Sequence, residues 1–402
     1  KENPDIENGV VKKKKAPERK IKMDEDKNGK KIVLAICYDF DKTLSPTDMQ
    51  AQGFIQSIGY DVENFWKESN KLASDNEMDQ NLAWMFMMSK GSYGKFIFNK
   101  DTLKEFGSKV ELFPGVKTWF ERINKYGEEH GVEVEHYIIS SGLKEMIEGT
   151  VIADKFKKIY ASSFYYDSDG VAIWPAQVVN YTDKTQFLFR IEKGVLDVND
   201  QQVNTFFKQN ELRVPFRNMV YIGDSDTDIP CMKLVNTNGG HSIGVYNSET
   251  NDKSKVFKML SENRIKYFAP ADYSENSKLE QLILKIIDRT KSNEILENFY
   301  FDCLDERNLA DKEISEEERN KNNLINKLEN SFNFKTTHFV IDELSKIDSW
   351  TEKQKQRLCK IGVENSQVFS ILTDPDVKDF YKEICKHCDS EYSKIIIKQI
   401  DS

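Results

Sequence analysis

Residues 36–46 read ICYDFDKTLSP, and this stretch decides the fold. The apolar run at 32–38 that leads into it predicts a buried β-strand. Two carboxylates, Asp39 and Asp41, then stand one residue apart just beyond that run. In open parallel sheets, ligands bind beyond the carboxyl ends of the strands. The stretch therefore predicts a parallel sheet with an acidic site at the end of its first strand.

Further apolar runs repeat this pattern along the chain. They lie at 135–139 and 219–222, with a weaker one at 242–246. Each run is followed by a turn rich in Gly, Ser or Asp and then by a helical pattern, as at 116–123 and 144–150. This alternation is typical of parallel βα units. We therefore predict an α/β fold, a Rossmann-like three-layer core with a parallel sheet, over residues 31–294.

Two segments interrupt the core pattern, and two more flank it. Helical patterns at 45–112 predict a helical insertion after the first strand, in the place where the family resemblance described below implies a cap. Alternating aromatic and polar residues around Asp169-Gly170 predict a hairpin or flap at about 159–180. The charged, helix-periodic composition of 295–402 predicts a mainly helical C-terminal module. Residues 1–30 are polar without periodicity, which predicts a flexible tail. Because Met23 would be a natural start, residues 1–22 are read as an added segment or an upstream extension.

Composition limits the partners. The net charge of −9 argues against a dedicated binder of duplex nucleic acid, so we expect no such partner. No apolar run approaches the ~18 residues of a membrane span, and the polar, lysine-rich beginning does not resemble a secretory signal. The six cysteines are scattered rather than arranged as a disulfide framework. We expect a cytoplasmic protein with no membrane partner.

Other polar groups of the core suit phosphate and metal binding. The hydroxyls and backbone amides at Ser140 and Ser141 can hold a phosphate oxygen. Lys184 is a mobile point charge that suits a phosphoryl group. Asp224 and Asp228 follow another apolar run, and hard carboxylate oxygens of this kind suit Mg²⁺. Together with the first pair of carboxylates, these groups predict phosphate chemistry assisted by magnesium.

In this order, the groups resemble the four motifs of haloacid dehalogenase (HAD) superfamily phosphatases, nearest the phosphoserine-phosphatase-like branch with a helical C1-type cap. The matches are Asp39, Asp41 and Thr43 for DxDxT; Ser140, with Ser141 as a shifted alternative, for the second motif; Lys184 for the third; and Gly223, Asp224 and Asp228 for GDxxxD. The resemblance covers roughly residues 30–290 and implies the HAD core fold with its cap.

The resemblance also implies roles for these residues. Asp39 would be the nucleophile that becomes phosphoaspartate, and Asp41 the general acid and base. Lys184 would bind the phosphoryl group and balance its charge. The residues expected around the phosphate are Thr43, which would also brace its turn, Ser140, Ser141, Gly142 and Lys184. Those expected at the Mg²⁺ ion are Asp39 through its carboxylate, Asp41 through its backbone carbonyl, and Asp224, with Asp228 helping to orient the metal site. Asp226 is assigned no required position.

The carboxylic acid at Asp41 favours phosphate-ester hydrolysis over dehalogenation. We therefore expect a Mg²⁺-dependent hydrolase that acts on a small phosphorylated metabolite. One alternative is an interaction or regulatory protein that uses the HAD core as a scaffold and acts through 295–402, by binding a protein partner or by self-association. Another is a phosphatase of nucleotides or nucleic-acid ends.

Two short stretches of the sequence can each be interpreted in two ways. The stretch 84–88, WMFMM, could line an aromatic pocket or form the core of the cap. Cys385 and Cys388 form a CxxC pair with Cys359 upstream, which could bind zinc or could be ordinary helix cysteines.

Overall fold

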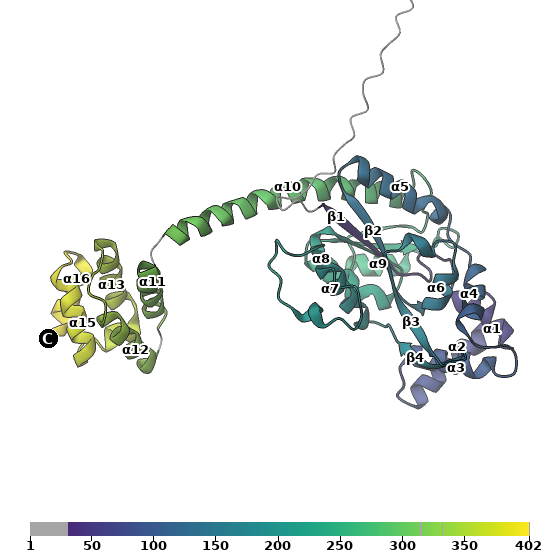
Figure 1. Cartoon of the computed structure of the whole chain (residues 1–402), viewed down its shortest axis with the longest axis horizontal. Helices are drawn as coiled ribbons and strands as arrows, with labels where there is room; N and C mark the ends of the chain where they lie inside the picture. Colours follow the sequence, from purple (N-terminus) through teal and green to yellow (C-terminus); the bar gives the residue numbers. More distant parts are fainter. Residues whose placement is uncertain (1–30, 314–315, 332, 402) are drawn as a thin grey trace, which may run out of the picture. The chain divides into compact units, whose positions relative to one another are not determined.

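The computed structural model describes residues 31–313, 316–331 and 333–401 (Figure 1). The tail predicted at 1–30 lies outside the described residues. The chain divides into two compact units between Phe301 and Asp302. The predicted boundary at 294/295 and the observed division both fall within one long helix, α10 (Lys278–Glu313), which is therefore continuous across the change in composition.

The first unit is built on one mixed sheet. Within the described residues the strands are β1 (Val33–Tyr38), β2 (Glu133–Leu143), β3 (Lys158–Tyr166), β4 (Ala172–Gln177), β5 (Met219–Gly223), β6 (His241–Tyr246) and β7 (Tyr267–Pro270). Their order in the sheet is β4-β3-β2-β1-β5-β6-β7, and only the β3–β4 pair is antiparallel. Strand β1 lies between β2 and β5 and runs parallel to both. The carboxyl ends of these three strands therefore lie next to one another.

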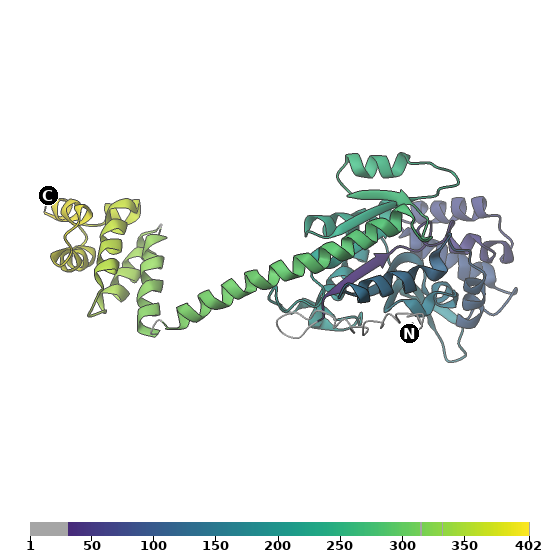
Figure 2. The ribbon, with the colours of Figure 1, turned by 90° about the horizontal axis from the view of Figure 1, so that it is seen from above.

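Helices cover both faces of this sheet (Figures 1 and 2). On β1, Leu34 and Ile36 pack in one apolar cluster with helices α5 (Val116–Glu129) and α10. Ala35 and Cys37 point the other way, into a cluster with the second set of helices. That set is α7 (Asp183–Lys193), α8 (Ile229–Thr237) and α9 (Ser254–Ser261). The predicted three-layer α/β fold is therefore confirmed.

A helical insertion follows β1, where the cap was predicted. Its helices are α1 (Phe54–Ser57), α2 (Val62–Asp75), α3 (Gln80–Ser92) and α4 (Lys100–Ser108), preceded by the 3-10 turn η1 (Met49–Ala51). Trp84, Met85 and Met88 are buried in the apolar cluster, whereas Phe86 is exposed. The structure therefore supports the interpretation of 84–88 as part of the core of the cap. Helix α6 (Lys144–Gly149) packs closely against α4, beside the core.

The hairpin predicted at about 159–180 is formed by β3 and β4. Strand β3 pairs with the main sheet up to Ser162 and then continues as the first arm of the hairpin. At the turn, Gly170 adopts a φ of +77°, a left-handed conformation that favours glycine. The backbone amide of Ala172 donates to the Phe98 carbonyl at 2.8 Å, so the second arm is attached to the cap.

Short 3-10 turns complete the first unit. They are η2 (Ala153–Lys155), η3 (Gln201–Asn204), η4 (Phe216–Asn218) and η5 (Asp226–Asp228). Asp224 follows β5 directly and η5 then carries Asp228, so the acidic residues of the fourth motif lie beside the end of β1.

The second unit is helical, as predicted. Its helices are α11 (Glu316–Glu329), α12 (Phe334–Ser345), α13 (Glu352–Glu364), α14 (Ser366–Ser370), α15 (Pro375–Lys386) and α16 (Glu391–Ile400). They share an apolar core of their own. Helix α15 begins after Asp374 with Pro375 in its first turn, where proline fits without losing a hydrogen bond. Among the described residues, we find no helix with the length and apolar character that a membrane span requires.

Candidate active site

The turn after β1 is tightly wound around one backbone carbonyl. The Asp39 amide donates to the Ile222 carbonyl at 2.9 Å, which ties the end of β1 to β5. The Phe40 carbonyl then accepts from the amides of Thr43, Leu44 and Ser45 at 3.2, 2.8 and 3.1 Å. This winding requires a left-handed conformation at one residue, Lys42, with a φ of +58°. The turn thereby fixes where Asp39 and Asp41 lie.

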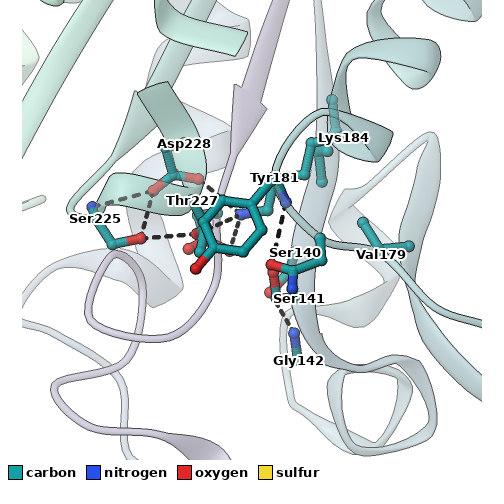
Figure 3. A network of polar contacts seen from close by, with 12 residues as sticks. Ser140, Ser141, Gly142, Val179, Tyr181, Lys184, Ser225, Thr227 and Asp228 are labelled. Atoms are coloured by element: carbon teal, nitrogen blue, oxygen red, sulfur yellow. Dashed lines mark hydrogen bonds and ion pairs between the residues drawn. The ribbon is translucent and has the colours of Figure 1, made fainter. Parts of the chain in front are cut away.

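The end of β2 brings Ser140 to the same place. The pairing of β2 with β3 shifts register between Ser140 and Leu143, so the strand is irregular where the second motif lies. The Ser140 hydroxyl accepts from the Gly142 amide at 3.1 Å (Figure 3). A Cβ at Gly142 would lie 2.9 Å from Oδ2 of Asp41 and 2.5 Å from Cε of Met49. Any larger residue here would therefore force the ends of the Met49 and Asp41 side chains to move.

Lys184 is fully buried between two carboxylates. It lies in the first turn of α7, and its Nζ is 2.7 Å from Oδ1 of Asp228 and 3.4 Å from Oδ1 of Asp39. Burial alone would lower the pKa of Lys184, but the charges of Asp228 and Asp39 raise it above its usual value. The lysine therefore stays a cation inside the protein.

The Asp228 carboxylate is surrounded by donors from the protein (Figure 3). Its Oδ1 accepts from Lys184 and from the Tyr221 hydroxyl at 2.8 Å. Its Oδ2 accepts from the amide and hydroxyl of Ser225 at 3.2 and 3.1 Å. Thr227 lies beside them, with its hydroxyl 2.9 Å from that of Ser225 and 3.4 Å from Nζ of Lys184. Both oxygens of Asp228 are thus held in place.

Asp39, Asp224 and Asp228 form an acidic cluster. Each offers one carboxylate oxygen, and these oxygens lie within 4.8 Å of one another. Burial, and then the charge of Asp228, raises the pKa of Asp39 to about 6, although Lys184 and the Ser140 hydroxyl oppose this shift. Burial likewise raises the pKa of Asp224 well above its usual value, with further contributions from Asp228 and Asp39. Excess negative charge is therefore concentrated at this point.

Asp41 lies beside this cluster and is half-buried. Its Oδ1 accepts from the Met49 amide at 2.8 Å. Burial raises the pKa of Asp41 well above its usual range, and the charges of Asp48 and Asp39 add to this effect. A raised pKa favours the protonated form of a carboxyl group, which is the form that can donate a proton to a reacting group.

Among the described residues, several buried polar atoms in or near the first two motifs have no hydrogen-bond partner, although one of them, Oδ1 of Asp39, has an ion pair with Lys184. They are Oδ1 of Asp39, Oγ1 of Thr43, Oε1 of Gln50 and Oγ of Ser141. Buried polar groups in proteins are nearly always satisfied, so such exceptions mark places where a ligand or ion supplies the missing contact. Their concentration in the segments of the first two motifs indicates a binding site for a polar ligand.

The structure separates the predicted site residues into groups. It brings together Asp39, Asp41, Ser140, Gly142, Lys184, Asp224 and Asp228. The Asp41 carboxylate is not part of the three-carboxylate cluster. Of the two serines, Ser140 is the one whose hydroxyl influences Asp39, whereas Ser141 uses its carbonyl to accept from Ser162 at 3.1 Å.

Of two further positions, Thr43 differs from its expectation, whereas Asp226, which was assigned no required position, agrees with it. Thr43 was expected to brace its turn, but its buried hydroxyl has no partner, and its backbone makes the bracing contacts, including a bond from the Tyr273 hydroxyl to its carbonyl at 2.8 Å. Asp226 is exposed and lies outside the acidic cluster.

Three residues of the site were missed by sequence reasoning. Tyr221 stood in an apolar strand and was taken for core, yet its hydroxyl contacts Asp228. Thr227 could have been found, because it lies inside the fourth motif. Asn81 comes from the cap, and its amide donates to the carbonyls of Val179 at 2.9 Å and Ser141 at 3.4 Å. No local signal marks Asn81, since its partners are distant in the sequence.

We compared the sequence with protein-family models and with known proteins. No protein-family model matches the chain. A protein of Borreliella burgdorferi described as uncharacterized is 27% identical over 290 residues, covering 65% of this chain and 98% of that protein.

Solved structures also resemble the chain. A HAD-family hydrolase from Salmonella enterica serovar Typhi is 16% identical with a TM-score of 0.42, covering 62% of this chain and 70% of that one. A probable phosphoserine phosphatase from Vibrio cholerae is 12% identical with a TM-score of 0.42, covering 65% and 67%. At these identities, the two structures do not assign an activity to this chain.

Proposed function

We propose that the chain is a Mg²⁺-dependent phosphomonoesterase of the HAD type, which acts on a small phosphorylated molecule through a phosphoaspartate on Asp39. The observation that carries this proposal is the contact of Lys184 with both Asp39 and Asp228 in one buried site. It joins a nucleophilic carboxylate, a cation for the phosphoryl oxygens and an acidic cluster, which is the set of groups that phosphoryl transfer to a carboxylate needs.

The acidic cluster fits a magnesium ion. Oδ1 of Asp39 is buried without a hydrogen bond, has the 3.4 Å ion pair with Nζ of Lys184, and lies beside two further carboxylates, an arrangement that a second cation would stabilise. Because the oxygens of Asp228 already accept from Lys184, Tyr221 and Ser225, we assign direct ligation to Asp39 and Asp224 and an orienting role to Asp228. When bound, the ion supplies positive charge that screens the nucleophile from an anionic substrate.

In the first step, a carboxylate oxygen of Asp39 attacks phosphorus, and the bond from phosphorus to the leaving oxygen breaks. Lys184 and the Ser140 hydroxyl hold the phosphoryl oxygens, so charge that moves onto them is stabilised. Asp41 gives its proton to the leaving oxygen, which departs as an alcohol. The raised pKa of Asp41 supports this assignment, because an ionised Asp41 would have no proton to give.

In the second step, Asp41 acts as a general base. Now ionised, it takes a proton from water as the water oxygen attacks phosphorus, and the bond from phosphorus to Asp39 breaks. Phosphate leaves and both carboxyl groups return to their starting states. The contact between the Met49 amide and Asp41 holds the carboxylate in place for both transfers.

The activity is tested with p-nitrophenyl phosphate and a panel of small phosphate esters. We expect hydrolysis with Mg²⁺ and none after EDTA. A phosphorylated oligonucleotide compared with a mononucleotide distinguishes a nucleic-acid end phosphatase. If the protein with Mg²⁺ hydrolyses none of these compounds, the proposed function is wrong.

Magnesium binding should depend on pH. A protonated carboxyl cannot ligate a cation, and the pKa of Asp39 is raised to about 6 while that of Asp224 is raised as well. We expect saturating Mg²⁺, at about a hundredfold excess over Kd, to raise the Tm by several degrees at about pH 8. This rise should be lost as the pH falls through about 6 and below.

The measurement is differential scanning fluorimetry with Mg²⁺ or with NaCl of equal ionic strength. Asp224→Asn should remove the Mg²⁺ effect, whereas Asp226→Asn, which changes an exposed carboxylate of the same turn, should keep it. An equal Mg²⁺ effect at about pH 5 would show that the ion binds to groups with ordinary pKa values.

Gly142→Ala should damage catalysis more than folding. The added methyl group would lie 2.9 Å from Oδ2 of Asp41 and 3.3 Å from Oγ of Ser140, so both groups must move. We expect kcat to fall about a hundredfold, the typical effect of an ångström-scale misplacement. Gly94→Ala is the control for strain alone: its φ of +72° makes alanine unfavourable and should lower stability, whereas its methyl group meets nothing within 4 Å and should leave kcat unchanged. A Gly142→Ala variant with unchanged kcat would contradict the close approach seen here.

A further inference from the structure

The C-terminal unit contains a cluster of cysteines that the proposed phosphatase site does not use. Cys359 lies in α13, Cys385 in the last turn of α15, and Cys388 just beyond that helix. Each side chain is at least nine-tenths buried. The sulfur atoms of Cys359 and Cys385 are 3.8 Å apart, which is van der Waals contact. Two free thiols therefore already touch between two helices.

The packing of α13 against α15 fixes this contact. The Tyr381 hydroxyl, one turn before Cys385, donates to the carbonyl of Leu358 at 3.3 Å, next to Cys359. A disulfide needs a sulfur separation of about 2.05 Å. The sulfurs must therefore approach by less than ~2 Å, which side-chain rotation and a small helix adjustment can supply. Cys388 also interacts with Cys359, and its thiol donates to the Ser390 hydroxyl at 3.6 Å, so it is a competing partner that the experiment must distinguish.

One thiol of the touching pair can meet a solute. A cleft of about 730 Å³ is lined by Cys385 and Cys388, together with His387, Lys394 and Lys398. Cys359 does not line this cleft and is fully buried behind Cys385. The hydrogen bond from Cys359 lowers the pKa of Cys385, although burial opposes this effect. A small oxidant would thus reach Cys385 first, and Cys359 second.

The geometry favours a dithiol over a metal site. Among the described residues, the group of three or more close ligands is the acidic trio of the first unit, and no cysteine belongs to it. Zinc requires about four ligands converging on one point. The positions of the three sulfur atoms therefore do not support the interpretation of the CxxC pair as a zinc site. The contact between Cys359 and Cys385 needs a different explanation.

We propose that Cys359 and Cys385 form a peroxide-sensitive dithiol that closes to a disulfide. The Cys385 thiolate attacks one oxygen of hydrogen peroxide, which gives the sulfenic acid and releases hydroxide. The Cys359 thiolate then attacks the Cys385 sulfur, forming the S–S bond and expelling hydroxide, which takes up the proton that Cys359 gave up. Overall, two thiols and one peroxide become one disulfide and two waters.

The experiment uses the full chain with Cys303→Ser, because Cys303 is exposed and would cross-link separate molecules. The protein is treated with hydrogen peroxide, unfolded in urea and labelled with a maleimide. Of the five remaining cysteines, we expect two to lose their label, and dithiothreitol should restore both. Peptide mapping should find Cys359 joined to Cys385.

Serine variants provide the matched controls. Cys388→Ser should keep the cross-link, and Cys359→Ser should abolish it and leave Cys385 open to overoxidation. Mapping in the chain that keeps all three cysteines needs no variant of the pair, so the test holds even where a serine variant fails to fold. A cross-link between Cys385 and Cys388, sulfinic acid on Cys385 without a cross-link, or five labelled cysteines after peroxide would each overturn the proposal.

Discussion

Asp39→Asn is expected to lower the hydrolysis of p-nitrophenyl phosphate about a thousandfold or more, because it replaces the proposed nucleophile by an amide that cannot accept a phosphoryl group. The variant should fold. Lys184 keeps its 2.7 Å contact with Asp228, and the acidic cluster loses one negative charge. The measurement is kcat in the presence of Mg²⁺, together with the Tm of the variant.

Asp226→Asn is the matched control for this variant. It makes the same chemical change on an exposed carboxylate that lies outside the acidic cluster. We expect its kcat to stay within about twofold of the wild-type value, since exposed substitutions away from special contacts change little. An Asp39→Asn variant that keeps more than about a tenth of the activity would mean that Asp39 is not the nucleophile.

The second large effect concerns Lys184. Lys184→Met removes the cation between Asp39 and Asp228 and leaves their carboxylates buried without it. Breaking a buried ion pair on one side typically costs about 3–5 kcal/mol of unfolding free energy. We therefore expect this loss in urea unfolding with EDTA present, and a loss of activity beyond what the remaining folded fraction explains.

A double variant separates the two effects of Lys184. Adding Asp228→Asn to Lys184→Met removes the stranded carboxylate, so part of the lost stability should return. Activity should not return, because the lysine that would hold the phosphoryl oxygens is still missing. If Lys184→Met alone unfolds at the wild-type urea concentration, the lysine is not the buried counter-ion that the structure describes.

Much of the site could be predicted because its residues obey local rules. Asp39 and Asp41 follow a buried strand at a spacing of two, and Asp224 follows another strand in the same way. Since parallel strands end at one edge of the sheet, such residues converge whatever the length of chain between them. The helical C-terminal unit was likewise predictable from its periodicity, as was the helix start at Pro375.

Other features depend on contacts that no local pattern encodes. The Tyr221 hydroxyl acquires its role only because Asp228 folds back against it from η5. Asn81 acts through carbonyls that the cap meets only after folding. The short edge strand β7 has too few residues to show alternation. Helix α10 escaped prediction because its apolar residues, Ile283, Ile286 and Ile287, give way to a charged sequence within the same helix.

The role of residues 295–402 in binding a partner or in self-association stays a prediction. The structure adds an independent apolar core for these helices and the touching thiols of Cys359 and Cys385. The pair is therefore a feature of this unit whatever partner it has.

The identity of the phosphorylated residue tests the central claim most directly. The protein is mixed with Mg²⁺ and a phosphate ester, quenched during turnover and treated with borohydride, which reduces a phosphoaspartyl group to homoserine. Peptide sequencing by mass spectrometry then locates the change. The account predicts homoserine at position 39, and none in a sample without substrate. Turnover accompanied by homoserine at position 41 or 224, or by phosphate on Ser140, would contradict it.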